Sequence, residues 1–361
     1  MSILWIVYFH TFRRFAEGRY PWPLNQGYWQ QLCEQLGPSV GSPECAARAL
    51  FIGFSSLGFH AVGVFIVLSG FALSFALARK GAAGAVDWRA WYRNRLVRLF
   101  PLYWCAHLIY LASPSQVYLE PIDYRFVLSF FGDRVVPLTE IFYYANAAWW
   151  YFGLLLQLYA VFPLLHLLRV RLGAGVFLAG SAVLTLVTRY VFLFPLGSEY
   201  SGALVQGALF TCRLFEFTVG MVLGAACARD RARADRRLLS WPVALAGAAL
   251  YVAGLYASDS RLAYVAADAL IGCGLTLLMA NLARWLEQVP RLQAPVAVVG
   301  AYSYGLYLLH QPYVIWLGDT MRERTTLASF TAVAVAATAV LALVSMAIER
   351  GVNRVVARVL G

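Results

Sequence analysis

The feature that most constrains this 361-residue chain is the recurrence of long apolar segments along nearly its whole length. A helix of about 20 apolar residues is long enough to cross a hydrocarbon core roughly 30 Å thick. Hydrophobic residues make up 61% of the chain and charged residues 13%, whereas soluble domains carry about 25% charged residues. Because a helix satisfies its backbone polar groups within one segment, continuous apolar runs predict an all-α, polytopic integral membrane protein rather than a β-barrel.

About ten transmembrane helices can be placed, and residues 1–361 are expected to form a single transmembrane domain. The first helix is too short to span alone, since only nine residues precede His10. Either the natural chain begins further upstream, as we expect, or neighbouring helices hold this segment. The spans are predicted at 1–12, 57–78, 97–112, 147–168, 173–196, 206–228, 241–257, 262–283, 294–317 and 327–348.

The formal net charge of +11 follows the pattern of membrane topology. With Arg98 counted at the inner edge of the third span, 18 of the 29 Lys and Arg residues fall in alternate connecting segments together with five acidic residues, whereas the other segments hold nine basic and 11 acidic residues. The positive-inside rule therefore predicts a multi-pass protein of the inner (plasma) membrane with both termini cytoplasmic. No basic stripe with interleaved aromatics is left over, so nucleic acid is not an expected partner.

The predicted outer loop 13–56 carries two of the six cysteines, Cys33 and Cys45. The other four lie within apolar runs, where cysteine acts as a small packing residue. A loop outside the cytoplasm lies in a compartment where a disulfide can form and persist. A Cys33–Cys45 disulfide and two free thiols are both left open by the sequence.

Ionisable side chains inside predicted spans are the first candidates for function, because a charge in hydrocarbon is costly unless it is paired or hydrated. His10 ends the apolar run of residues 5–10, WIVYFH. A neutral imidazole can take the proton from an attacking hydroxyl, which makes His10 the candidate catalytic base. A histidine that is hydrogen-bonded to a neighbouring helix is the structural alternative.

An arginine cluster marks the inner end of the third predicted span. Arg93, Arg95 and Arg98 lie in the segment 91–104, WYRNRLVRLFPLYW. Guanidinium groups bind phosphates through bidentate hydrogen bonds, so the cluster could hold the phosphates of coenzyme A. Arginines that merely mark the inner membrane boundary are the simpler alternative.

Three further segments place polar side chains inside predicted spans. Ser69 precedes a glycine, and close helix packing is better supported than a nucleophile, since no G-x-S-x-G turn surrounds it. Arg213 and Glu216 lie at i, i+3 on one helix face, either as a structural pair or as part of a site. His310 comes just before Pro312, which should bend the helix, and either lines a site or is structural. No metal site is expected.

Taken together and in this order, these segments resemble the membrane acyltransferase 3 family of bacterial and fungal O-acyltransferases. The resemblance runs from His10 to about Trp316. It implies that His10 is the essential catalytic residue and that Arg93 and Arg95 handle the acyl-CoA donor, with Arg98 beside them. The candidate residues lining the site are Ser69, Tyr103, Tyr159, Arg213, Glu216 and His310.

The chain departs from the family pattern at three positions. The family's first helix carries an arginine, ten intervening residues and the histidine, and here that arginine would fall before Met1. The acidic residue often found six positions before the serine is Gly63, and the glutamate of a segment like residues 150–159 is Leu155. These departures indicate a divergent branch whose reaction is better determined than its substrate.

The expected function is therefore membrane O-acyltransfer, most simply O-acetyl transfer from acetyl-CoA to a hydroxyl of a cell-surface or exported polysaccharide or its lipid-linked precursor. Acyl-CoA is expected as a co-substrate, with no tightly bound cofactor. A transporter or flippase of glycan lipids or small polar substrates is the alternative, with intramembrane charges forming a polar path. A passive membrane scaffold is a third class. Expected partners are membrane lipid, acyl-CoA and a glycan or other hydroxylated acceptor, and a homo-oligomer is left open.

Overall fold

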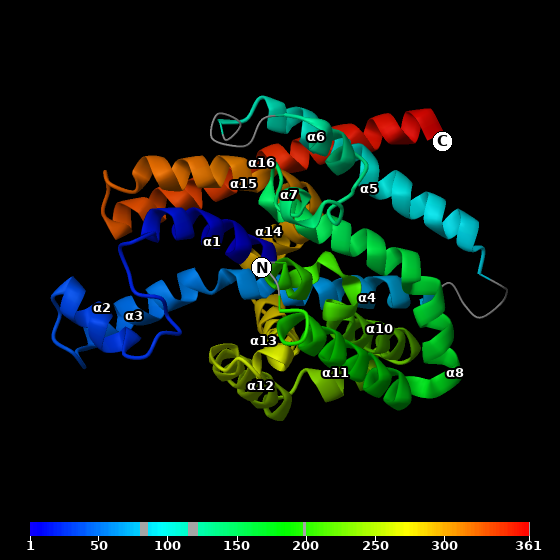
Figure 1. The fold of residues 1–361 in the computed structure, drawn as a ribbon, viewed down its shortest axis with the longest axis horizontal. Coiled ribbons are helices and arrows are strands. Elements are labelled where there is room, and N and C mark those ends of the chain that lie inside the picture. Colours follow the sequence, from blue (N-terminus) through cyan, green and yellow to red (C-terminus); the bar gives the residue numbers. More distant parts are fainter. Residues whose placement is uncertain (80–85, 115–121, 198–199, 361) are drawn as a thin grey trace. The chain divides into compact units, whose positions relative to one another are not determined.

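The structure is a computed structural model that describes residues 1–79, 86–114, 122–197 and 200–360 (Figure 1). It is 83% helical, and no strand occurs in these described ranges. The prediction of an all-α fold is therefore confirmed.

The longer helices are α1 (Ser2–Ala16), α3 (Pro43–Ser56), α4 (Ala61–Arg79), α5 (Trp88–Leu111), α8 (Trp150–Leu193), α10 (Leu214–Arg229), α12 (Trp241–Asp259), α13 (Tyr264–Glu287), α14 (Pro290–Ala301), α15 (Ser303–Met321) and α16 (Leu327–Leu360). Shorter helices lie between them: α2 (Tyr28–Leu36), η1 (Gly58–His60), α6 (Tyr124–Phe130), α7 (Leu138–Ile141), η3 (Ala147–Trp149), α9 (Ser201–Ala203), η4 (Leu204–Ala208), η5 (Phe210–Arg213) and α11 (Arg231–Leu238).

Six helices in the described ranges are long and apolar enough to cross a membrane. The count becomes seven if α14 and α15, which meet at an angle of 79°, form one broken span. The predicted number of ten is therefore approximate, and the difference has physical causes. Helix α1 has only 15 residues, which is about 22 Å. The predicted spans 147–168 and 173–196 both lie within α8, which a break at Gly173 (φ 73°, ψ 164°) divides into two helices, and they are counted once among the six.

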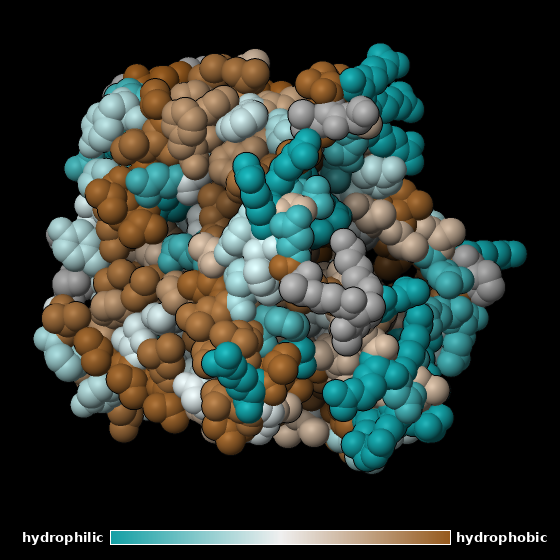
Figure 2. All heavy atoms as spheres, turned by 90° about the vertical axis from the view of Figure 1, so that its right-hand side faces the viewer, coloured by the Kyte–Doolittle hydropathy of each residue, from teal (hydrophilic) through white to brown (hydrophobic). Residues whose placement is uncertain are grey.

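The surface agrees with a lipid environment. On the face drawn in Figure 2, hydrophobic side chains form broad continuous areas, and hydrophilic ones gather in patches. Many large apolar side chains lie exposed on the long helices, among them Leu108, Val183, Leu245 and Leu343, each more than 59% exposed. Soluble monomers rarely expose apolar areas of this extent, so lipid is the solvent of these helices.

The chain forms two compact units. Unit 1 comprises Met1–Ala61, Cys105–Leu119 and Pro295–Gly361, and unit 2 comprises Val62–Trp104 and Glu120–Ala294. Each unit therefore contains segments that are far apart in the sequence. The expectation of a single transmembrane domain stays a prediction.

In unit 1, α1 packs chiefly against α15 and also contacts α16 and α3 (Figure 1). Its apolar side chains form a core in which Phe12 and Phe15 are fully buried against Phe330 of α16. The rings of Phe15 and Phe330 are stacked with their centroids 3.9 Å apart. Helix α1 is thus held by neighbouring helices, which compensates for its short length.

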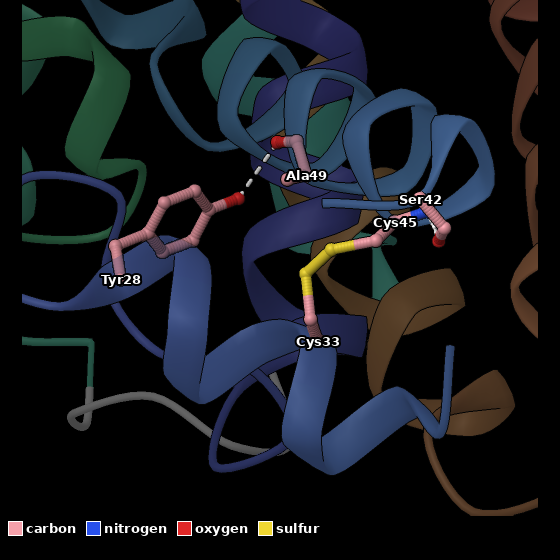
Figure 3. The surroundings of a disulfide bond; sticks show 5 residues. All are labelled: Tyr28, Cys33, Ser42, Cys45 and Ala49. Carbon is pink, nitrogen blue, oxygen red and sulfur yellow. Dashed lines mark hydrogen bonds between the residues drawn. A yellow bond between two sulfur atoms is a disulfide. The ribbon is translucent and has the colours of Figure 1, made fainter. Parts of the chain in front are cut away.

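Residues 13–56 are largely ordered as the helices α2 and α3, which a Cys33–Cys45 disulfide links (Figure 3). The Cα atoms of the two cysteines are 5.5 Å apart. Ser42 caps α3 by accepting a hydrogen bond from the backbone N–H of Cys45, at 3.2 Å. The Tyr28 hydroxyl donates to the carbonyl of Ala49 at 2.8 Å, and burial raises the pKa of Tyr28 to about 12.

In unit 2, glycines allow α4 and α10 to touch backbone to backbone. A Cβ atom added at Gly70 would lie 2.0 Å from the carbonyl oxygen of Phe217, and one at Gly220 would lie 1.9 Å from that of Val67. No side chain fits at such distances, so these glycines fix how closely the helices approach. Around this contact, Phe162 and Met221 form part of a core shared with α8.

Candidate functional site

Two histidines that the sequence singles out lie side by side in unit 1. His10 comes from α1 and His310 from α15, and their ring centroids are 5.3 Å apart, with the ring planes at 42°. His310 is fully buried and His10 is half-buried. The packing of α1 on α15 thus brings two imidazole rings together.

The hydrogen bonds of His310 determine which of its nitrogens carries the proton. Its Nδ1 atom lies 3.0 Å from the carbonyl oxygen of Leu306 and 2.9 Å from that of Tyr307. Carbonyl oxygens only accept, so Nδ1 is the donor, and the neutral ring keeps its lone pair on Nε2. Within the described ranges, this buried Nε2 has no hydrogen-bond partner. An unsatisfied buried acceptor costs free energy and therefore calls for a functional explanation.

Aromatic residues enclose the histidine pair on the side of α1. The ring of Phe9 lies 5.0 Å from that of His10 and 5.4 Å from that of Phe59. Phe59 in turn packs at 4.2 Å against His60, which is buried. The sequence reasoning did not select His60, although a histidine at the start of an apolar span is the same kind of signal as His10.

The three candidate donor-binding arginines lie on the first half of α5, in unit 2. Arg93 and Arg98 are exposed, and neither makes an ion pair with any residue that the structure describes. Arg95 is half-buried, with its guanidinium 5.9 Å from the ring centroid of Trp91, and it interacts with Tyr159. The cluster thus carries unneutralised positive charge beside Tyr159, and such a charge suits phosphate groups.

Ser69 and Tyr103 have structural partners in unit 2. The hydroxyl of Tyr151 donates to the carbonyl of Phe65 at 3.1 Å, so its oxygen can accept from the Ser69 hydroxyl 2.9 Å away. Tyr103 is fully buried, donates to the carbonyl of Ser129 at 2.9 Å, and stacks on Phe152. These contacts favour packing over a catalytic role for both residues.

Arg213 and Glu216 belong to a larger buried ion network in unit 2. Arg213 Nε and Glu216 Oε1 lie 2.9 Å apart, and Arg213 Nη1 lies 3.0 Å from Asp268 Oδ2. The same Asp268 oxygen lies 2.6 Å from Nη1 of Arg189, which also donates to the carbonyls of Val265 and Tyr264. Two cations and two anions leave the network neutral.

The sequence reasoning missed two members of this network as site candidates. Arg189 and Asp268 are 79 positions apart, so no local spacing connects them. Their position could have identified them as candidates, since both are ionisable residues inside predicted spans. The neutral network, which is tied to backbone carbonyls, reads as a structural device that joins α8, α10 and α13.

The space around Gly63 explains why this position carries no acidic residue. A Cβ atom at Gly63 would lie 2.7 Å from the Cα of Gly272 and 3.8 Å from an Nη atom of Arg213. An acidic side chain at residue 63 would therefore point toward a guanidinium that Glu216 and Asp268 neutralise in this chain. Leu155, where the family segment has an acid, is buried.

The two sets of residues define a class of protein. One is a buried imidazole pair, which can move the proton of a hydroxyl, and the other is an arginine cluster suited to anions, both carried by apolar helices. Among the described residues, no group of three or more His, Cys, Asp and Glu could hold a metal ion. This combination indicates a membrane-embedded enzyme.

Comparison with known proteins identifies the family. Residues 1–348 match the acyltransferase domain of the membrane acyltransferase 3 family, and the chain belongs to this family. The resemblance deduced from the motifs is thereby confirmed, and the protein is a multi-pass membrane acyltransferase. No curated protein and no solved structure matched the chain.

Proposed function

We propose that this acyltransferase moves an acyl group, most simply acetyl, from acyl-CoA to a hydroxyl of a cell-surface or exported polysaccharide or its lipid-linked precursor. The observation that carries the proposal is the His10–His310 pair with its unoccupied acceptor nitrogen. Such a pair provides a base for a hydroxyl, and O-acyl transfer needs one.

In the proposed reaction, a ring nitrogen of His10 takes the proton of the acceptor hydroxyl as the oxygen attacks the thioester carbonyl. The carbon–sulfur bond then breaks, the acyl group stays on the acceptor oxygen, and the imidazolium returns its proton to the leaving thiolate. His310 would support the imidazolium, because its Nε2 lone pair can accept a hydrogen bond directly or through one water molecule.

Arg93, Arg95 and Arg98 would hold the phosphates of the donor. Arg93 and Arg98 are exposed without a carboxylate partner in the described ranges, and Arg95 is anchored by Trp91 and Tyr159. The network of Arg189, Arg213, Glu216 and Asp268 gives no support to the transporter alternative, since its charges neutralise one another.

The proposed location is the plasma membrane, with both termini cytoplasmic and the donor arginines at the inner face. The charge distribution of the sequence supports this orientation through the positive-inside rule. The Cys33–Cys45 disulfide supports placing residues 13–56 outside the cytoplasm, because disulfides persist in oxidising compartments.

The test is a donor assay with the purified protein in lipid nanodiscs and radiolabelled acetyl-CoA. We expect release of coenzyme A, and His10→Ala should lower its rate by about 100-fold or more, because general base catalysis contributes 10²–10⁴. His166→Ala, a change of the half-buried histidine of α8, is the matched control. Equal rates for His10→Ala and the unchanged protein would overturn the role of His10.

The acceptor is tested by mass spectrometry of surface glycans from a deletion strain and from strains complemented with each form. A glycan heavier by one acyl unit only where active protein is present would identify the acyl group and the acceptor class together. Identical glycans in all strains would rule out a surface polysaccharide as the acceptor.

A further inference from the structure

A polar cavity lies in unit 1 at the C-terminal end of α15, the helix that carries His310. Its volume is about 480 Å³, within the roughly 300–1,000 Å³ of small-molecule sites. The residues that line it are Trp316, Asp319, Thr320, Arg322, Glu323 and Arg324. The roles assigned so far use none of them.

Helices α1 and α15 run in the same direction from the histidine pair toward this cavity. After His10 and His310, the next close polar contact is Arg14 Nε with Asp319 Oδ1 at 3.7 Å, followed by Arg322 Nη1 with Glu17 Oε2 at 3.4 Å. With a rise of 1.5 Å per residue, the backbone of Trp316 lies about 9 Å along the axis from His310. The lining of the cavity therefore begins nearly two helical turns beyond the histidine pair and extends past the end of α15.

The lining combines one aromatic ring with hydrogen-bond donors and acceptors. The Trp316 side chain is 44% exposed. Glu323 and Arg324 are exposed, and their side chains bond to no residue in the described ranges. Carboxylates accept hydrogen bonds from hydroxyls, guanidinium groups donate to them, and an indole face covers the apolar C–H side of a sugar ring.

The charge of the lining distinguishes between possible ligands. Two carboxylates and two guanidinium groups line the cavity, so their charges cancel. An anion such as a lipid phosphate would gain no net attraction there, in contrast to the arginine cluster of α5. A neutral ligand with many hydroxyls fits the balance of donors and acceptors.

We propose that this cavity binds a neutral saccharide unit of the acceptor, beyond the histidine pair along α15. This inference rests on the proposed O-acyl transfer to a glycan, and it deepens it by assigning the acceptor subsite to the end of α15. The ring packs on Trp316, while Glu323 and Arg324 bind its hydroxyls. A hydroxyl of the same or the next sugar unit then reaches His10.

Direct binding tests the proposal without acyl transfer. Saturation-transfer difference NMR on the protein in phosphatidylcholine nanodiscs would use methyl β-D-glucoside, methyl α-D-mannoside and N,N′-diacetylchitobiose as neutral probes, with glucose 1-phosphate as the anionic probe. We expect at least one neutral probe to bind and Trp316→Ala to weaken its binding about tenfold, as for an aromatic anchor. Trp285→Ala, which removes a 57% exposed tryptophan of α13, should change nothing.

Glu323→Gln and Arg324→Gln keep the test decisive if Trp316→Ala does not fold, since both side chains are exposed. Each should weaken the same neutral probe. The proposal is overturned if no neutral probe binds, if binding survives all three substitutions, or if only glucose 1-phosphate binds. Coenzyme A release by the same preparations tests the proposed acyl transfer separately from the saccharide site. Release without saccharide binding would overturn only the saccharide site, and saccharide binding without release would overturn only the proposed donor reaction.

Discussion

Two buried polar groups in this protein are built on opposite principles. In unit 2, Arg189, Arg213, Glu216 and Asp268 neutralise one another, and Arg189 also donates to backbone carbonyls. In unit 1, the ring of His310 packs beside that of His10, and its Nε2 atom has no hydrogen-bond partner among the described residues. The network of unit 2 balances its charges, although Glu216 Oε1, Glu216 Oε2 and Arg213 Nε make no hydrogen bond among the described residues. The open acceptor of His310 has no such ionic partner, so it costs stability and is available to a substrate or a second catalytic group.

Breaking the closed network should have the largest effect on stability. Asp268→Ala leaves two buried guanidinium groups with one carboxylate, and removing one partner of a buried ion pair costs about 3–5 kcal/mol. The variant should unfold at a clearly lower temperature, measured by thermal unfolding in nanodiscs. At a temperature where it is still folded, its KM for acetyl-CoA should be unchanged.

Asp259→Ala is the matched control, because Asp259 is an exposed carboxylate at the end of α12. Its unfolding temperature should stay at the value of the unchanged protein. If Asp268→Ala were as stable as this control but inactive, the network would belong to the catalytic site, and the contrast between the two units would collapse.

Replacing His310 should have the opposite effect: activity should fall while stability is kept. His310→Phe keeps an aromatic ring and removes the unsatisfied Nε2, so the unfolding temperature should stay equal or rise. The kcat for acyl transfer should fall about tenfold or more if His310 supports His10 as proposed. The pH profile of kcat should change as well, which loss of packing alone would not produce.

His166→Phe is the control for that substitution. The interpretation requires that His310→Phe lowers kcat without lowering the unfolding temperature. A His310→Phe protein that loses stability and activity in parallel would show His310 to be a packing residue. An unchanged kcat would show that His10 works without it.

Ser69→Ala should have the smallest effect. The serine hydroxyl is 2.9 Å from that of Tyr151, and a hydrogen bond of this kind contributes about 1 kcal/mol. We expect a slightly lower unfolding temperature and a rate of acyl transfer close to that of the unchanged protein. A large loss of activity with normal stability would place Ser69 in the catalytic site after all.

The sequence was sufficient for features that depend on local composition. Apolar runs predicted the all-α membrane fold, and the i, i+3 spacing of Arg213 and Glu216 predicted neighbours on one helix face, 2.9 Å apart in the structure. It was less exact for helix limits: the break between the spans predicted at 147–168 and 173–196 falls at Gly173, but residues 169–172, predicted as an inner turn, are still helical. Apolar content alone cannot decide where a long helix ends.

Contacts between distant segments could not be predicted from the sequence. His10 and His310 were each selected as candidates, but only the packing of α1 on α15 brings their rings together. Likewise, Arg189 and Asp268 meet because α8 and α13 are neighbours. The cavity beyond His310 depends on how α15 ends, and its residues are ordinary polar residues in the sequence.

The disulfide between α2 and α3 has a practical consequence for preparing this protein. Helix α2 has nine residues and buries only Leu32 and Cys33, so it has little apolar packing of its own. A small element of this kind depends on its cross-link for order. Expression in a thiol-rich host, or dithiothreitol in the buffers, should loosen this pair of helices before any membrane helix melts, so oxidising conditions are the better choice for purification.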